Sequence, residues 1–108
     1  MSYNIELTDN FKKEAKKLIK RYASLRNEIA ELGKDLSETP FQGTHLGNDI
    51  YKIRLAIASK NKGKAGGARV IAYVKIIEET VFLLSIYNKG EKDDISDSEI
   101  EYLLQDYL

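Results

Sequence analysis

The chain has 108 residues, of which 31% are charged and 43% are apolar, and its 17 basic and 17 acidic side chains cancel. This composition predicts one globular domain over residues 1–108, because so short a chain cannot build two cores. The absence of cysteine excludes a disulfide framework and a thiolate site. No apolar run approaches the roughly 18 residues of a membrane span, and the N-terminus does not resemble a signal peptide, so we expect a cytoplasmic protein.

The N-terminal third predicts a short strand followed by a helical hairpin. Residues 3–7 alternate between apolar and polar side chains, as a strand requires. Thr8 or Asp9 is the expected cap of a helix whose apolar residues recur at helical spacing over 11–22. A second stripe of the same kind over 25–36 predicts the other arm of the hairpin.

The rest of the chain predicts an antiparallel sheet and one more helix. Residues 49–58, 68–77 and 80–88 are strand-like and are joined by short connections. A capping box at 96–99 opens a short C-terminal helix. The expected fold class is therefore α+β, with the helical hairpin packed on one face of a small antiparallel sheet.

Positive charge is concentrated between residues 50 and 77, where no acidic residue occurs. The segment contains Lys52, Arg54, Lys60, Lys62, Lys64, Arg69 and Lys75. Such a concentration of cations predicts a polyanionic partner, of which a nucleic-acid backbone is the commonest. Residues 91–108 instead carry seven acids and one lysine. This acidic tail either folds over the basic sheet or solvates the last helix, and we favour the second interpretation.

The motifs of several other chemistries are missing. His45 is the only histidine, and no phosphate-binding loop, dinucleotide-binding motif or nucleophile elbow occurs. We therefore expect no metal and no cofactor. Lysine, arginine and tyrosine can nevertheless cleave RNA, by activating its 2′-hydroxyl, stabilising the phosphorane and protonating the leaving oxygen.

The two-residue period of a strand predicts where such groups meet. Lys52 and Arg54 share a face, and Arg69 begins the middle strand, where we expect it to be largely exposed. Strict alternation along the last strand places Tyr87 and Lys89 on the face opposite Phe82, Leu84 and Ile86. A meander can bring all five polar residues together, although they could also simply solvate an exposed face.

Three segments of the chain resemble the RelE/ParE superfamily of bacterial toxins, and above all its HigB-type branch. They are residues 51–55 (Tyr-Lys-Ile-Arg-Leu), residues 62–73 with the basic loop and Arg-Val-Ile, and residues 83–92. The resemblance runs in order from about Phe11 to the C-terminus. It implies the toxin of a type II toxin–antitoxin pair, a metal-independent mRNA endonuclease that acts on the ribosome and inhibits translation. The implied partners are ribosome, mRNA and a cognate antitoxin from the adjacent gene, with no membrane and no small-molecule cofactor.

The resemblance also assigns roles to residues of this chain. Arg69 matches the arginine that binds the scissile phosphate, and Lys52 and Arg54 match the basic pair that stabilises charge. Tyr87 and Lys89 fall in the segment that supplies further catalytic groups. The residues expected to bind RNA are Lys60, Lys62, Lys64 and Lys92.

Other readings stay open at this point. Gly90 and Ser96 stand where some members have an arginine and a tyrosine, so the general acid and base are not assigned. The alternatives to a nuclease are a ParE-like toxin that binds DNA gyrase and a non-toxic RNA-binding domain. The helical faces are expected to be consumed by the core, which leaves the basic face and the sheet edge for an antitoxin.

Overall fold

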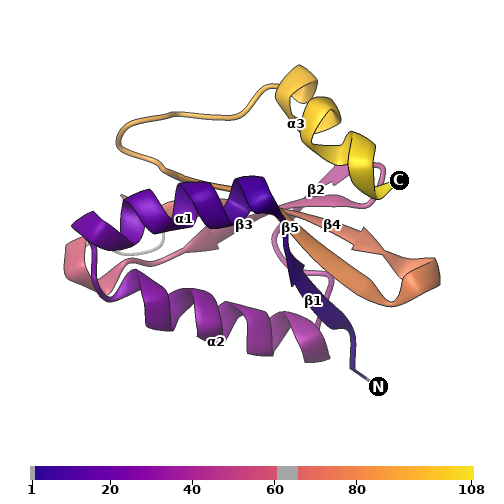
Figure 1. Ribbon diagram of the computed structural model, residues 1–108, viewed down its shortest axis with the longest axis horizontal. Helices are drawn as coiled ribbons and strands as arrows, with labels where there is room; N and C mark the ends of the chain where they lie inside the picture. The colour runs from indigo at the N-terminus through magenta and orange to yellow at the C-terminus, as the bar shows by residue number, and fades with distance from the viewer. Residues whose placement is uncertain (1, 61–65) are drawn as a thin grey trace.

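The computed structural model describes residues 2–60 and 66–108 and contains a five-stranded sheet with three α-helices (Figure 1). In chain order the elements are β1 (Asn4–Leu7), α1 (Asp9–Arg21), α2 (Leu25–Glu38), β2 (Thr44–Gly47), β3 (Ile50–Leu55), β4 (Ala68–Lys75), β5 (Thr80–Asn88) and α3 (Asp97–Leu104). Short 3₁₀ turns occupy Ala58–Lys60, Ile76–Glu78 and Gln105–Tyr107. The predicted α+β class, with a helical hairpin, a sheet and a short last helix, is confirmed.

The sheet is larger than the predicted three-stranded meander. Its strand order is β1-β5-β4-β3-β2, with β1 parallel to β5 and every other pair antiparallel. Strand β2 could not be predicted from its composition, because this edge strand has only four residues and three of them are exposed. Asn48 and Asp49 connect it to β3 with φ angles of 51° and 62°, the left-handed pair that a two-residue hairpin turn needs.

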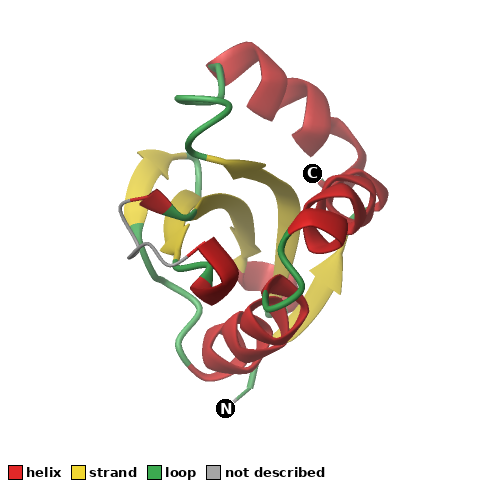
Figure 2. Cartoon of the chain, turned by 90° about the vertical axis from the view of Figure 1, so that its left-hand side faces the viewer, coloured by secondary structure: helices red, strands yellow, loops and turns green. Residues whose placement is uncertain are grey.

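The helical hairpin covers one face of the sheet (Figure 2). Thr8 begins α1 as predicted, since its Oγ1 accepts a hydrogen bond from the Phe11 N–H at 3.2 Å. Phe11 and Leu25 are fully buried against Val70 and Leu83 of the central strands. Burial of each such side chain contributes about 1.5–3 kcal/mol, so this layer forms the larger core.

The opposite face is covered by α3. Ser96 caps this helix as predicted, because its Oγ accepts from the Glu99 N–H at 3.2 Å, whereas the Glu99 carboxylate pairs with Lys92 and does not complete the capping box. Ile100 and Leu104 of this helix pack with Ile71 of β4. We refer to this side of the sheet as the α3 face.

A bulge in β5 reverses the alternation of its side chains. Ile71 pairs with Ser85 but the next residue, Ala72, pairs with Leu83, so Leu84 is an extra residue. Leu83 and Ile86 therefore pack under the helical hairpin, whereas Leu84 and Tyr87 lie on the α3 face. The prediction that Leu84 and Ile86 share a face was wrong for this reason.

Glu14 of α1 holds the bulge in place. One of its carboxylate oxygens, Oε1, accepts hydrogen bonds from Ser85 Oγ at 2.7 Å and from the Ile86 N–H at 3.3 Å. Asn10 Nδ2 donates to the carbonyl of the extra residue, Leu84, at 3.0 Å. The polar groups that the bulge removes from the strand ladder are thus bonded to α1.

Two further findings concern only residues 2–60 and 66–108. No helix there has the length and apolar character needed to cross a membrane. No group of three His, Asp or Glu side chains is arranged to hold a metal ion.

Candidate active site

The strand register brings the predicted catalytic residues to one end of the α3 face. Arg54 of β3 pairs with Arg69 of β4, and Arg69 pairs in turn with Tyr87 of β5. Directly paired residues project from the same face of a sheet. Lys52 lies two residues before Arg54 on that face, and Lys89 follows β5 with its backbone N–H donating to the Gly67 carbonyl at 3.1 Å. We refer to five of these residues as the cationic cluster: Lys52, Arg54, Arg69, Tyr87 and Lys89.

Arg69 lies deeper in the cationic cluster than the sequence suggested. Only 6% of the residue is exposed, so the expectation of a largely exposed side chain was wrong. The reason is that β4 is the central strand of the sheet, with β3 and β5 on either side. Its Nη1 donates to the Ala68 carbonyl at 3.2 Å, which helps to fix the orientation of the guanidinium group.

Tyr87 is buried as well, with 5% of the residue exposed. Burial, together with the nearby Asp94 carboxylate, raises the pKa of Tyr87 to about 12. Its hydroxyl donates to Asp94 Oδ1 at 3.4 Å, and the Lys92 ammonium lies 5.5 Å from the ring centroid. A covered phenol that holds its proton so firmly is poorly suited to donate that proton or to stack on a base. Lys89 and Lys92 become the next candidates for proton donor.

The raised pKa of Tyr87 predicts a specific loss of stability in alkali. The proton is bound more tightly in the folded chain than at the ordinary pKa of 10.0, so its contribution is complete below pH 10. That contribution is lost as the pH rises from 10 to about 12. We expect Tyr87→Phe, which has no such proton, to lose less stability over this range in urea-unfolding measurements. Tyr102→Phe, at a residue that is 75% exposed, should follow the wild type; matching pH profiles for all three proteins would contradict the assignment.

An acidic segment between β5 and α3 contacts the cationic cluster. Asp94 Oδ1 lies 3.3 Å from Lys52 Nζ, and Asp93 Oδ1 lies 3.0 Å from Lys89 Nζ. The pKa of Asp94 lies below its ordinary value, mainly because its carboxylate accepts a hydrogen bond from the Ile95 N–H and also because it accepts one from Lys52. Our preferred interpretation, in which the acidic tail only solvates the last helix, was therefore wrong for these residues. We call residues 91–94 the acidic strap.

The basic loop is described only at its two ends. Lys62, Lys64 and the Lys60 side chain lie outside the described residues. At the end of the loop, a Cβ atom added to Gly67 would lie 2.2 Å from the Leu55 carbonyl oxygen. The backbone of residue 67 therefore approaches β3 as closely as only glycine allows.

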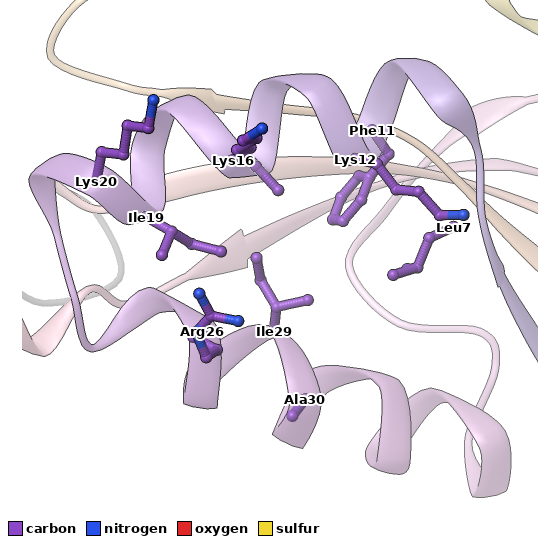
Figure 3. A pocket seen from close by; sticks show the side chains of 10 residues that line it. Leu7, Phe11, Lys12, Lys16, Ile19, Lys20, Arg26, Ile29 and Ala30 are labelled. Carbon is purple, nitrogen blue, oxygen red and sulfur yellow. The ribbon is translucent and has the colours of Figure 1, made fainter.

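A second feature, which the sequence analysis missed, is a groove of about 620 Å³ between α1 and α2 (Figure 3). Its apolar lining comes from Leu7, Phe11, Ala15, Ile19 and Ile29, and its charged residues are Lys12, Lys16, Lys20 and Arg26. The core does take up most of the apolar face of the hairpin, as expected, but Ile19 and Ile29 are only partly buried and line the groove. The sequence does contain the signal, because a lysine follows each apolar residue at 11, 15 and 19.

Comparison with known proteins relates nearly all of the chain to one family. The family described as "RelE toxin of RelE / RelB toxin-antitoxin system" matches residues 4–105. A mutant of the E. coli toxin RelE in the free state is 20% identical, with full coverage of both chains and a TM-score of 0.66.

Two similar structures are toxin–antitoxin complexes. The intact E. coli RelBE complex is 22% identical over 81% of this chain and 96% of the other, with a TM-score of 0.62. A RelBE complex from Mycobacterium tuberculosis is 17% identical over 82% of this chain and 99% of the other, with a TM-score of 0.59. At these identities the solved structures establish a shared fold.

Proposed function

Because the chain belongs to the RelE toxin family, we propose that residues 1–108 form the toxin of a type II toxin–antitoxin pair. In this proposal it acts in the cytoplasm as a ribosome-dependent mRNA endonuclease that inhibits translation. The supporting observation is the cationic cluster, in which strand register sets Arg54 beside Arg69, with Lys52 and Lys89 at the same end of the sheet. Within the family, the resemblance of residues 51–55 and 62–73 favours the HigB-like branch.

The proposed reaction needs no group beyond the side chains of the chain and solvent water. The 2′-hydroxyl of the RNA loses its proton to solvent water as its oxygen attacks the adjacent phosphorus. A 2′,3′-cyclic phosphate forms, and the 5′-oxygen of the next nucleotide leaves with a proton from the protein. Arg54 and Arg69 bind the phosphate oxygens as negative charge accumulates, a task for which paired guanidinium groups are well suited. Lys52 adds to this stabilisation, and Lys89 or Lys92 supplies the proton. Lys60, Lys62 and Lys64 would contact the RNA backbone.

Expression of the chain without a partner tests the nuclease assignment. We expect growth arrest together with new mRNA 5′ ends inside translated frames, mapped across the transcriptome before cell death. DNA damage with intact mRNA would instead identify a ParE-like toxin that acts on gyrase. Unimpaired growth at a confirmed level of folded protein would favour a non-toxic RNA-binding domain.

We further propose that a cognate antitoxin from the adjacent gene binds the groove between α1 and α2. RelBE complexes from E. coli and M. tuberculosis show that similar toxins bind antitoxins. The groove combines an apolar floor with four basic residues and no acidic residue in its lining. It therefore fits an amphipathic helix whose apolar stripe is flanked by Asp or Glu.

Charge reversal at the rim of this groove should weaken the complex. We expect Lys12→Glu/Lys16→Glu to raise the dissociation constant of the co-expressed neighbouring protein about tenfold, or ~1.4 kcal/mol, at low salt. The loss should shrink as salt screens the rim. Lys13→Glu/Lys34→Glu makes the same change of charge at exposed helical positions outside the groove lining. Isothermal titration calorimetry that finds equal losses for both variants would place the antitoxin elsewhere.

A further inference from the structure

We propose that the acidic strap is an internal anion that occupies phosphate-binding positions of the cationic cluster and that RNA must displace. This inference rests on the proposed function, whose site it regulates. The strap comprises residues 91–94, which lead from β5 toward α3 through the long connection visible in Figure 1.

The contacts of the strap reproduce those expected of a nucleic-acid backbone. Asp94 Oδ1 accepts from Lys52 Nζ at 3.3 Å and from the Tyr87 hydroxyl at 3.4 Å. Asp93 accepts from Lys89 Nζ twice, through Oδ1 at 3.0 Å and through its carbonyl at 2.9 Å. A carboxylate oxygen on a lysine ammonium makes the same charge-assisted hydrogen bond as a phosphate oxygen. Consecutive anions thus engage two of the lysines assigned to RNA cleavage.

Contacts with other elements hold the strap across the site. Glu91 forms an ion pair with Arg21 of α1 and accepts a hydrogen bond from Asn88 Nδ2 at 3.1 Å. Lys92 Nζ pairs with Glu99 of α3 at 2.9 Å. The strap is therefore fastened toward both α1 and α3, and this positions its two aspartates over the end of the sheet.

The contacts between the acidic strap and the cationic cluster are nevertheless weak enough for RNA to displace them. The side chains of Asp93 and Asp94 are 96% and 65% exposed, and ion pairs in such positions contribute little to stability. Arg54 is exposed, and among residues 2–60 and 66–108 it has no carboxylate partner within ion-pair distance. Arg54 can therefore bind a first phosphate before the following phosphates replace the aspartates.

Fluorescence anisotropy with a labelled single-stranded 2′-O-methyl RNA oligonucleotide tests the inference, because this probe cannot be cleaved through its own 2′-hydroxyl. We expect Asp93→Asn/Asp94→Asn to bind it about three- to tenfold more tightly than the wild type at low salt. Asparagine keeps an acceptor for the Ile95 N–H, which bonds to Asp94 Oδ1 at 2.9 Å, so the fold should persist. The gain should disappear near ~1 M salt, where the Debye length is about 3 Å.

A control variant separates the strap from net charge. Glu101→Gln/Asp106→Asn removes two acids from the same C-terminal region, and neither residue contacts the cationic cluster. We expect its affinity to stay within about twofold of wild type, since only long-range, screened attraction changes. An equal gain in both double variants, or a gain in neither while the wild type binds RNA, overturns the inference and leaves the proposed function standing.

A second measurement covers the case in which none of the proteins binds RNA, which would count against the proposed function. The ¹³C carboxyl resonances of Asp93 and Asp94 are then followed by NMR as inorganic tripolyphosphate is added. Movement of both resonances, with those of Glu101 and Asp106 unchanged, shows that the strap yields to a polyphosphate. Resonances of Asp93 and Asp94 that do not move overturn the inference.

Discussion

Arg69→Ala is expected to abolish toxicity, with cleavage slowed by about 10²–10³ from the loss of a phosphate contact in the transition state. Arg69→Lys should still impair cleavage, because an ammonium group cannot offer the two parallel donors of a guanidinium group. The measurement is the yield of new mRNA 5′ ends after induction of each variant at equal protein level. Arg26→Ala, which removes an exposed arginine from α2, should cleave as the wild type does.

The burial of Arg69 makes a stability measurement part of this experiment. Because only 6% of the residue is exposed, truncation removes buried atoms and leaves the Ala68 carbonyl without one of its donors. A loss of about 1–3 kcal/mol is the ordinary consequence of such a change. The free energy of unfolding of Arg69→Ala therefore has to be compared with that of Arg69→Lys. A folded Arg69→Ala protein that remains toxic would remove this residue from the proposed mechanism.

Gly67→Ala is expected to destabilise the fold by about 3 kcal/mol, the upper end of what added atoms in a packed site usually cost. The new Cβ would lie 2.2 Å from the Leu55 carbonyl oxygen and 3.1 Å from the Ala56 Cα. Both neighbours are backbone atoms, so no side-chain rotation relieves the overlap. The end of β3 or the start of β4 must move, and Arg69 lies only two residues further on. We therefore expect lost stability and impaired cleavage together.

Gly33→Ala is the matched control for Gly67→Ala. Gly33 lies inside α2, and the nearest atom to an added Cβ is Ile5 Cγ2 at 3.9 Å, an ordinary contact. Alanine in place of glycine in a helix interior stabilises by up to about 1 kcal/mol. Urea unfolding should thus shift in opposite directions for the two variants. A Gly67→Ala protein as stable as the wild type would show that the loop end can be repacked.

The sequence predicted best those parts of the fold whose signals are local. The helical hairpin follows from apolar spacing over 11–22 and 25–36, and the last helix follows from the capping box at 96–99. The edge strand β2 has only four residues, three of them exposed, and depends on pairing with β3, so its own composition could not identify it. The bulge likewise depends on a contact with Glu14, which lies 71 residues before Ser85.

The residues of the candidate site were easier to predict than their environment. Basic composition and strand period pointed to Lys52, Arg54 and Arg69, and the register places the two arginines side by side. The burial of Arg69 could not be predicted, because it depends on the order of strands in the sheet. The position of the acidic strap also depends on the path of a loop, which charge segregation along the chain does not reveal.

The extra residue in β5 has a consequence for comparing this chain with its homologues. Deleting Leu84 would restore uninterrupted pairing with β4 and leave Tyr87 paired with Arg69, but it would remove the carbonyl that accepts a hydrogen bond from Asn10. The extra residue in β5 is therefore tied to the hydrogen bonds that Asn10 and Glu14 of α1 make with the bulge. An alignment that follows polar and apolar alternation through this strand will assign every position after Ser85 to the wrong face. Homologues that keep an acid at the position of Glu14 should also keep the extra residue in β5. Homologues without this extra residue should carry the counterparts of Tyr87 and Lys89 one position earlier.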